Sequence, residues 1–298
     1  MLGILKNKTR IKQQVLGINQ RNAALVYRYN HRKDYKLADD KVLSKTLLDK
    51  AGIACADTYA VIERIGDIPT IWATLQRYDK LAIKPANGSG GGGIKILVKD
   101  EQDRWQSSGK PVDASLIFQH MANIIMGIYS LGGKDRVLIE YCITPHTFFQ
   151  EIYPAGVPDF RVILLEAVPL MAMLRVPTDQ SDGKANLHQG GLGIGIDMER
   201  GVLTQGFDGQ HYHDYHPDNQ HNIRDKCIPM WDELLRLSVA TAEAFPLRYL
   251  GVDIVLDQEL GPLVMEVNVR PGLSIQKVNK TGMKAALRDH SCFAEVLV

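Results

Sequence analysis

The chain has 298 residues, of which 45% are hydrophobic and 23% are charged, and its formal net charge is +1. This balance is typical of a folded globular protein and excludes general disorder. No apolar run reaches the about 20 residues that a membrane-spanning helix requires. Lysines follow the first apolar residues at once, so we expect no secretory signal. The four cysteines form no CxxC pair, which favours a reducing, cytoplasmic location.

The basic residues are concentrated at the N-terminus. Residues 1–36 hold nine Lys or Arg and one Asp, which leaves 26 basic and 33 acidic residues in the rest of the chain. An acidic body argues against a specific nucleic-acid partner. We expect this basic arm, residues 1–38, to pack on the chain's own body, because Tyr27, Tyr29 and Tyr35 offer interface-type contacts. The alternatives are docking on a partner subunit, and binding to a membrane protein or an anionic membrane surface. We also expect the chain to form a homo-oligomer.

Hydrophobic periodicity and turn residues predict the elements that follow the arm. In chain order they are a helix at 41–51 capped by Asp39 or Asp40, extended chain at 53–62, strands at 81–85 and 94–98, a helix at 113–128, a strand at 136–143, a hairpin of 160–168 with 170–176, a long loop at 206–228, a helix at 229–245 opening on Pro229, and a hairpin of 250–256 with 263–269. The elements do not alternate regularly, which favours an α+β fold with antiparallel sheets.

A glycine-rich loop lies between the strands at 81–85 and 94–98. Its residues are Asn87, Gly88, Ser89, Gly90, Gly91, Gly92 and Gly93, and Lys84 precedes it. Glycine lets backbone N–H groups approach phosphate oxygens closely. The spacing fits neither a P-loop nor a dinucleotide-binding fingerprint. We therefore predict a flexible lid over phosphates with Lys84 at its base; the alternative is a plain hairpin turn.

Three oxygen-bearing side chains interrupt the apolar strands of the last hairpin. Glu266 and Asn268 are two residues apart and share a face, and a turn centred at 259–260 places Asp253 opposite Glu266. Facing carboxylates repel each other unless a cation neutralises them, so the pattern predicts a magnesium site. The alternative is a solvent-facing polar side of a sheet. Glu266→Gln or Asp253→Asn should then abolish turnover with little effect on folding.

These motifs, in this order, resemble the ATP-grasp superfamily over residues 39–272. The resemblance implies two α+β subdomains that grip ATP, at 39–142 and 143–298 of an ATP-grasp domain spanning 39–298. It implies that Lys41, Lys84 and the glycine loop bind the nucleotide, with ATP between the loop and the acidic hairpin. A strand with Glu140, Tyr141, Cys142 and Ile143 would hold the adenine. Asp253, Glu266 and Asn268 would bind one or two Mg²⁺, with Mn²⁺ as the alternative ion.

Further motifs resemble the α-L-glutamate ligases that modify ribosomal protein. They are Asp159-x-Arg161, Met173-x-Arg175, Asn186-x-His188-x-Gly190-Gly191 and the segment from Glu266 to Gly272. The resemblance adds Asn186 and His188 to the nucleotide site and makes Arg161, Arg175 and Arg270 the catalytic residues. Residues 193–197, 216–217 and 228–231 resemble instead a branch described as sugar-transfer-associated. Gln189 and Arg270 depart from the glutamate-ligase pattern, which puts the amino-acid pocket in question.

The implied activity is ATP-dependent ligation of a carboxylate to an amine through an acyl phosphate, with release of ADP and phosphate. One substrate would be a small amino acid, with glutamate as the first candidate, and the acceptor is open. The alternatives are a kinase-like phosphotransferase and a non-catalytic nucleotide-binding partner of a membrane or polymer-modifying system. Arg161 has a structural alternative as well, a cross-strand ion pair with Glu166 or another acid.

Overall fold

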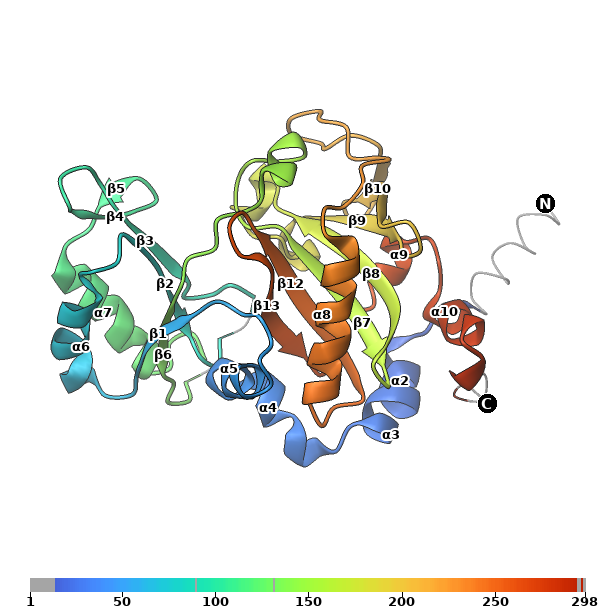
Figure 1. The fold of residues 1–298 in the computed structure, drawn as a ribbon, viewed down its shortest axis with the longest axis horizontal. Helices are drawn as coiled ribbons and strands as arrows, with labels where there is room; N and C mark the ends of the chain where they lie inside the picture. Colours follow the sequence, from blue (N-terminus) through green and yellow to red (C-terminus); the bar gives the residue numbers. More distant parts are fainter. Residues whose placement is uncertain (1–13, 89, 131, 294–295, 297–298) are drawn as a thin grey trace. The chain divides into compact units, whose positions relative to one another are not determined.

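The computed structural model describes residues 14–88, 90–130, 132–293 and 296, and their path is drawn in Figure 1. The chain divides into two compact units. The glycine-loop unit comprises residues 39–46 and 55–143, and the acidic-hairpin unit comprises the described part of 1–38 together with 47–54 and the chain from 144 onward. Each unit contains an antiparallel sheet with helices packed on it, so the expected α+β class is confirmed. No helix in the described ranges is long and apolar enough to cross a membrane.

The glycine-loop unit is built on a sheet of six described strands in the order β1-β6-β2-β3-β4-β5. The strands are β1 Thr58–Ile62, β2 Lys80–Pro85, β3 Lys95–Lys99, β4 Trp105–Ser107, β5 Lys110–Pro111 and β6 Val137–Glu140. Strand β6 lies between β1 and β2 although it comes last in the sequence. Strands β2 and β3 pair with each other, so the loop between them is anchored at both ends in one sheet.

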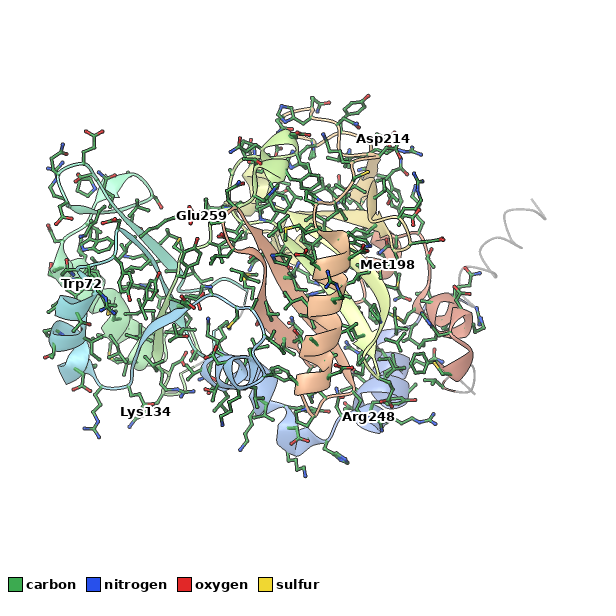
Figure 2. All side chains as sticks on the ribbon, in the orientation of Figure 1. Trp72, Lys134, Met198, Asp214, Arg248 and Glu259 are labelled. Carbon is green, nitrogen blue, oxygen red and sulfur yellow. The ribbon has the colours of Figure 1, made fainter. Side chains whose placement is uncertain are left out.

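Helices α6, Ile68–Leu75, and α7, Ala114–Ile125, pack on this sheet (Figure 1). Their apolar side chains meet those of β1, β2, β3 and β6 in one hydrophobic core. Trp72 of α6, labelled in Figure 2, is 6% exposed, and its ring centroid lies 5.4 Å from the ring centroid of Trp105. Helix α6 was not predicted; Pro69 occupies one of its first two positions, where proline is tolerated.

Two short helices lead from the arm into the glycine-loop unit. They are α4, Lys36–Asp39, and α5, Lys41–Lys50, which matches the helix predicted at 41–51. Of the two candidate caps, Asp40 is the one that acts: its Oδ1 accepts the backbone N–H groups of Val42 and Leu43 at 3.0 and 3.2 Å. Gly52, with φ of +66°, follows the end of α5.

The acidic-hairpin unit is built on a sheet of seven described strands in the order β11-β10-β9-β8-β7-β12-β13. The strands are β7 Asp159–Leu165, β8 Val168–Val176, β9 Leu192–Asp197, β10 Val202–Phe207, β11 Tyr212–His213, β12 Tyr249–Asp257 and β13 Gly261–Asn268. The predicted loop at 206–228 is thus partly a strand pair, with further bridges from Tyr215 to Asn222 and from Cys227 to Val202.

Both predicted hairpins of this unit form, with small corrections at the turns. The turn between β7 and β8 is Glu166–Ala167, both at positive φ, so Val168 begins the second strand and does not end the first. In the pair β12–β13 the register shifts by one residue between Asp253 and Ile254. This β-bulge places Asp253 opposite Glu266 even though Asp257 pairs with Gly261 at the turn.

Helix α8, Trp231–Ala244, lies across β7, β8, β12 and β13 (Figure 1). It does not open on Pro229 as predicted, because Met230 adopts a left-handed conformation and the helix begins at Trp231, two residues after Pro229. Helices α9, Ile275–Val278, and α10, Met283–Asp289, also pack on this sheet. Short 3-10 helices occupy the ranges 32–34, 65–67, 147–151, 179–181, 187–189 and 291–293.

The described part of the basic arm packs on the acidic-hairpin unit, as expected. It contains α2, Ile18–Arg21, a π-helical segment, Asn22–Val26, and α3, Tyr27–Tyr29. The Asn30 amide donates to the Tyr249 carbonyl at 2.6 Å and accepts the Tyr249 N–H at 3.0 Å. Arg21 donates to the Pro271 carbonyl at 2.8 Å. These contacts are buried hydrogen bonds, and Leu25 and Val26 of the same segment are fully buried.

Candidate active site

One face of the acidic-hairpin sheet carries the charged residues that the motifs singled out. Arg161 of β7 lies opposite Asp253 of β12, which in turn lies opposite Glu266 of β13. Arg175 of β8 lies opposite Asp159 of β7. Side chains two residues apart on a strand share a face, so the register alone brings four strands' charged groups together.

Asp253 is the centre of this cluster. Its side chain is 1% exposed. Arg161 holds it with two hydrogen bonds, from Nε to Oδ1 at 2.7 Å and from Nη2 to Oδ2 at 2.6 Å. Arg175 Nη2 adds a bond to Oδ2 at 2.8 Å, and the Asn268 amide donates at 3.1 Å. Burial would raise the pKa of Asp253, but the two guanidinium groups lower it to about 2. Asp253 is therefore ionised and bonded on both oxygens.

Arg175 connects Asp253 to a second buried carboxylate. Its Nε lies 3.1 and 3.0 Å from the two oxygens of Asp159, which is 2% exposed. Burial raises the pKa of Asp159 to about 6, against the lowering effect of Arg175. The Asp253 and Asp159 carboxylates raise the pKa of Arg175, which stays charged. Arg161, Arg175, Asp159 and Asp253 form one hydrogen-bonded network.

This network changes the interpretation of two sequence-based hypotheses. Arg161 does form the cross-strand ion pair that was the alternative to a catalytic role, but its partner is Asp253; Glu166 pairs with Arg248 instead. The repulsion expected between Asp253 and Glu266 is also relieved without a metal, because guanidinium groups surround Asp253. The expectation that Asp253→Asn has little effect on folding therefore loses its premise.

The donor set nevertheless fits a hard divalent cation. Glu266 and Asn268 lie on the face that carries Asp253, and all three can offer oxygen ligands. Glu266 is half-buried and so retains access to solvent. Three carboxylates and two guanidinium groups leave the cluster with one formal negative charge. Within the described ranges no group of three His, Cys, Asp or Glu side chains is placed to hold a metal, and in this donor set the third donor would be the Asn268 amide oxygen.

The glycine-loop unit contains a second ionic cluster, with Glu140 at its centre. Lys84 of β2 pairs with Glu140 Oε1 and Lys45 of α5 lies 3.1 Å from Oε2. Burial would raise the pKa of Glu140, which is 3% exposed, but Lys84 and Lys45 lower it. The carboxylate is therefore ionised. Sequence reasoning assigned Glu140 to adenine binding through its backbone and missed Lys45, whose signal was its position four residues after Lys41 on the same helix face.

The glycine loop is anchored from both sides. Lys41 Nζ donates to the Gly88 carbonyl at 2.6 Å, and the backbone N–H of Asn87 donates to Asp135 at 3.0 Å. A side chain at Gly93 would lie 2.6 Å from the Tyr129 ring, so only glycine fits there. Gly90, Gly91 and Gly93 have positive φ, which glycine adopts without strain. Ser89 lies outside the described residues. Side-chain hydrogen bonds and glycine-specific conformations therefore fix the loop, and lysines lie beside it. These features disfavour a plain hairpin turn.

The remaining nucleotide-site candidates lie in two segments. Strand β6 ends at Glu140, and Tyr141, Cys142 and Ile143 continue as irregular chain, with the Tyr141 N–H bonded to the Asp57 carbonyl. In the other unit, Asn186 caps a 3-10 turn by accepting the His188 N–H at 3.1 Å, and His188 is exposed. No described contact brings Asn186 or His188 to Asp253.

Arg270 lies apart from the buried network. It follows Asn268 by two residues, is exposed, and its guanidinium lies 4.9 Å from the centre of the Tyr35 ring. It lines a cavity of about 490 Å³ together with Tyr27, Asn30, His31, Arg32 and Tyr35. Sequence reasoning proposed Arg270 for a substrate carboxylate and missed the arm residues, because no local pattern connects positions about 240 residues apart.

Comparison with known proteins supports the fold. The sequence model of a family described as "Sugar-transfer associated ATP-grasp" matches residues 20–291. The ATP-grasp ligase PsnB, solved with a phosphomimetic variant of its minimal precursor, Mg and ADP, is similar at 14% identity and a TM-score of 0.50, over 91% of this chain. D-alanyl-alanine synthetase A from Vibrio cholerae is similar at 12% identity and a TM-score of 0.50, over 88% of this chain. The expected ATP-grasp fold is thereby confirmed.

The chain is shorter than these proteins. It covers 62% of PsnB and 65% of the Vibrio cholerae synthetase. A D-alanine–D-alanine ligase from Bacillus anthracis, at 16% identity and a TM-score of 0.45, is likewise covered to 65%, over 88% of this chain. The chain therefore spans less than two thirds of each of these structures. No curated protein matches its sequence.

Proposed function

This chain belongs to the sugar-transfer-associated ATP-grasp family, and from that premise we propose that it is an ATP-dependent ligase that activates a carboxylate. The observation that carries the proposal is the cluster around Asp253. It combines three carboxylates, an amide and two guanidinium groups on adjacent strands of one sheet face. Such a mixture suits phosphoryl transfer, which requires charge neutralisation more than covalent catalysis.

The residues of each unit take different roles in this proposal. In the glycine-loop unit, Lys84, Lys41 and the N–H groups of the glycine loop bind the phosphates of ATP. In the acidic-hairpin unit, Asp253, Glu266 and Asn268 are the residues that would hold Mg²⁺, which supplies neutralisation of phosphate charge when bound. Arg161 and Arg175 keep Asp253 ionised and oriented, and they present further N–H groups to a transferring phosphoryl group.

Carboxylate activation explains why ATP is used. A carboxylate does not accept an amine without a good leaving group, so its phosphorylation to an acyl phosphate precedes attack by the amine. The second step forms a C–N bond and releases phosphate, and the nucleotide product is ADP. An amino acid such as glutamate remains the first candidate substrate, and the family description makes a sugar-linked acceptor the natural second substrate to test.

Hydroxylamine trapping tests the proposal directly. The protein is incubated with ATP, Mg²⁺, hydroxylamine and a panel of amino acids and acidic sugars, and hydroxamate and nucleotide products are measured. We expect a hydroxamate with one acid of the panel, and ADP as the product. AMP and pyrophosphate as main products would contradict it. A phosphorylated product that hydroxylamine does not intercept would favour the kinase-like alternative.

A further inference from the structure

The cavity beside Arg270 has the size and lining of a small-molecule site. Its volume of about 490 Å³ lies within the range of ligand pockets, about 300–1,000 Å³. Five of its six lining residues, from Tyr27 to Tyr35, belong to the basic arm, and the sixth follows strand β13. Two tyrosine rings give it apolar and hydroxyl-bearing walls, a combination that accepts an organic molecule.

The charges of this cavity are positive and unpaired. Two guanidinium groups, those of Arg32 and Arg270, line it, and none of the lining residues is acidic. Among the residues that the structure describes, neither Arg32 nor Arg270 forms an ion pair, whereas Arg161 and Arg175 are both bonded to carboxylates. Two guanidinium groups at one cavity attract an anion, and their fork geometry matches a carboxylate or a phosphate.

The walls of the cavity are held in place by buried contacts. Asn30, which is 4% exposed, is fixed by two hydrogen bonds to the backbone of Tyr249. On the other side, Arg21 is 6% exposed and bonds the carbonyl of Pro271, the residue after Arg270. Both walls are therefore formed before a ligand arrives, which reduces the entropy cost of binding.

One lining residue of the cavity, Arg270, closely follows the candidate metal ligands in the sequence. Arg270 is two residues from Asn268, at the end of the strand that carries Glu266. A substrate whose reacting carboxylate lies at the Asp253 cluster needs a second anchor for whatever part does not react. An anchor that holds the non-reacting part of the substrate positions its reacting carboxylate, although the anchoring residues do not themselves react.

We propose that the cavity binds the non-reacting anionic group of a substrate, and that Arg32 of the basic arm and Arg270 hold it together. The group is a carboxylate or a phosphate, since both match the two guanidinium forks. This inference rests on the proposed ligase function for the place of the substrate, but the binding of an anion does not depend on turnover.

Equilibrium binding without ATP tests the inference. Glutarate and inorganic phosphate are titrated by calorimetry into the full chain and into the variants Arg270→Gln, Arg32→Gln and Arg270→Lys. Loss of one charge-assisted bidentate contact corresponds to about a tenfold or greater rise in Kd. We expect that rise in both glutamine variants and a smaller one in Arg270→Lys. Arg236→Gln on α8, an exposed arginine outside the cavity, is the matched control and should bind like wild type.

The outcomes separate the inference from the proposed function. Tighter binding of glutarate identifies a carboxylate as the group, and tighter binding of phosphate identifies a phosphate. Two results would overturn the inference even if hydroxamate forms. One is that neither probe binds at 10 mM, which corresponds to a binding free energy of about 3 kcal/mol. The other is that wild type and Arg270→Gln have equal Kd values. Anion binding that is lost in the variants, with no hydroxamate from any acid, would leave the inference standing and refute the ligase proposal.

Discussion

The two units carry ionic clusters of opposite sign. In the glycine-loop unit two ammonium groups, Lys45 and Lys84, flank one carboxylate, Glu140, which leaves one positive charge. In the acidic-hairpin unit three carboxylates share two guanidinium groups, which leaves one negative charge. A surplus of positive charge suits phosphates, and a surplus of negative charge suits a metal cation. Both clusters consist of buried salt bridges, but their net charges differ in sign and therefore favour ligands of opposite charge.

The carboxylates of the acidic-hairpin cluster also differ in how deeply they are buried. Asp253 is 1% exposed and bonded on both oxygens. In the chain without a ligand, its carboxylate therefore neutralises Arg161 and Arg175. Glu266, opposite it, is half-buried. Two carboxylates of one candidate metal set therefore differ in how far folding depends on them, and mutation can measure that difference.

The largest expected effect is on catalysis, in Glu266→Gln. The change removes one charge from the candidate metal set, and loss of several kcal/mol of charge stabilisation corresponds to a drop of about a thousandfold in turnover. The melting temperature should stay close to that of wild type. Steady-state ADP release measures the first and calorimetry the second. Glu243→Gln, at an exposed position of α8, is the control. Normal turnover in Glu266→Gln would remove Glu266 from the site.

The next effect is on stability, in Asp253→Asn. Removing one partner of a buried ion pair leaves charge uncompensated and costs about 3–5 kcal/mol. We expect the lower end of this range, because Arg175 keeps Asp159. Urea unfolding should show this loss in Asp253→Asn and no more than about 0.5 kcal/mol in the less buried Glu266→Gln. Equal stabilities of the two variants would show that the arginine network does not depend on Asp253.

The smallest effect concerns acid stability and tests the other cluster. Because the pKa of Glu140 is lower in the folded chain than its usual value of 4.5, this residue stabilises the fold above pH 4.5. That stability is lost as pH falls through the lowered pKa. Glu140→Gln should flatten the dependence by up to one proton, about 1.4 kcal/mol per pH unit.

Acid titration followed by tryptophan fluorescence measures this dependence, since Trp72 and Trp105 lie in the core of the same unit. Glu101→Gln, at an exposed turn, is the control and should keep the wild-type pH profile. An unchanged profile in Glu140→Gln would mean that the Lys45 and Lys84 pairs do not stabilise this unit.

Much of the fold follows from local patterns in the sequence. Alternating and continuous apolar runs predict both hairpins of the acidic-hairpin unit and the strands around the glycine loop, because side-chain burial controls strand identity. Asp253 was placed opposite Glu266, but through a turn geometry that the chain does not adopt. Asp257 pairs with Gly261, and a bulge near Met265 restores the expected facing pair. Glycine often marks a turn in the sequence, but this bulge has no comparably simple sequence signal.

The site was less predictable because its contacts join distant residues. Nothing local indicates that Arg161 bonds Asp253, 92 positions away, or that Lys45 shares Glu140 with Lys84. The motifs identified which residue types gather, but the pairing among them depends on sheet order. The arm's contribution to the cavity at Arg270 was missed for the same reason, since five of its lining residues precede the sixth by more than 230 positions.

The contact between Asn30 and Tyr249 has a consequence for how the protein is made. The two residues are 219 positions apart, and Leu16 and its hydrogen-bond partner Gln276 are 260 apart. A ribosome adds about 5–20 residues per second, so the arm waits on the order of ten seconds or more for its docking surface. During that time Leu25 and Val26, which are fully buried in the folded chain, lie in a segment whose docking partner Tyr249 does not yet exist. Until Tyr249 of β12 has been made, Asn30 has no partner for these buried hydrogen bonds, so the arm docks only after most of the chain that follows it has been synthesised.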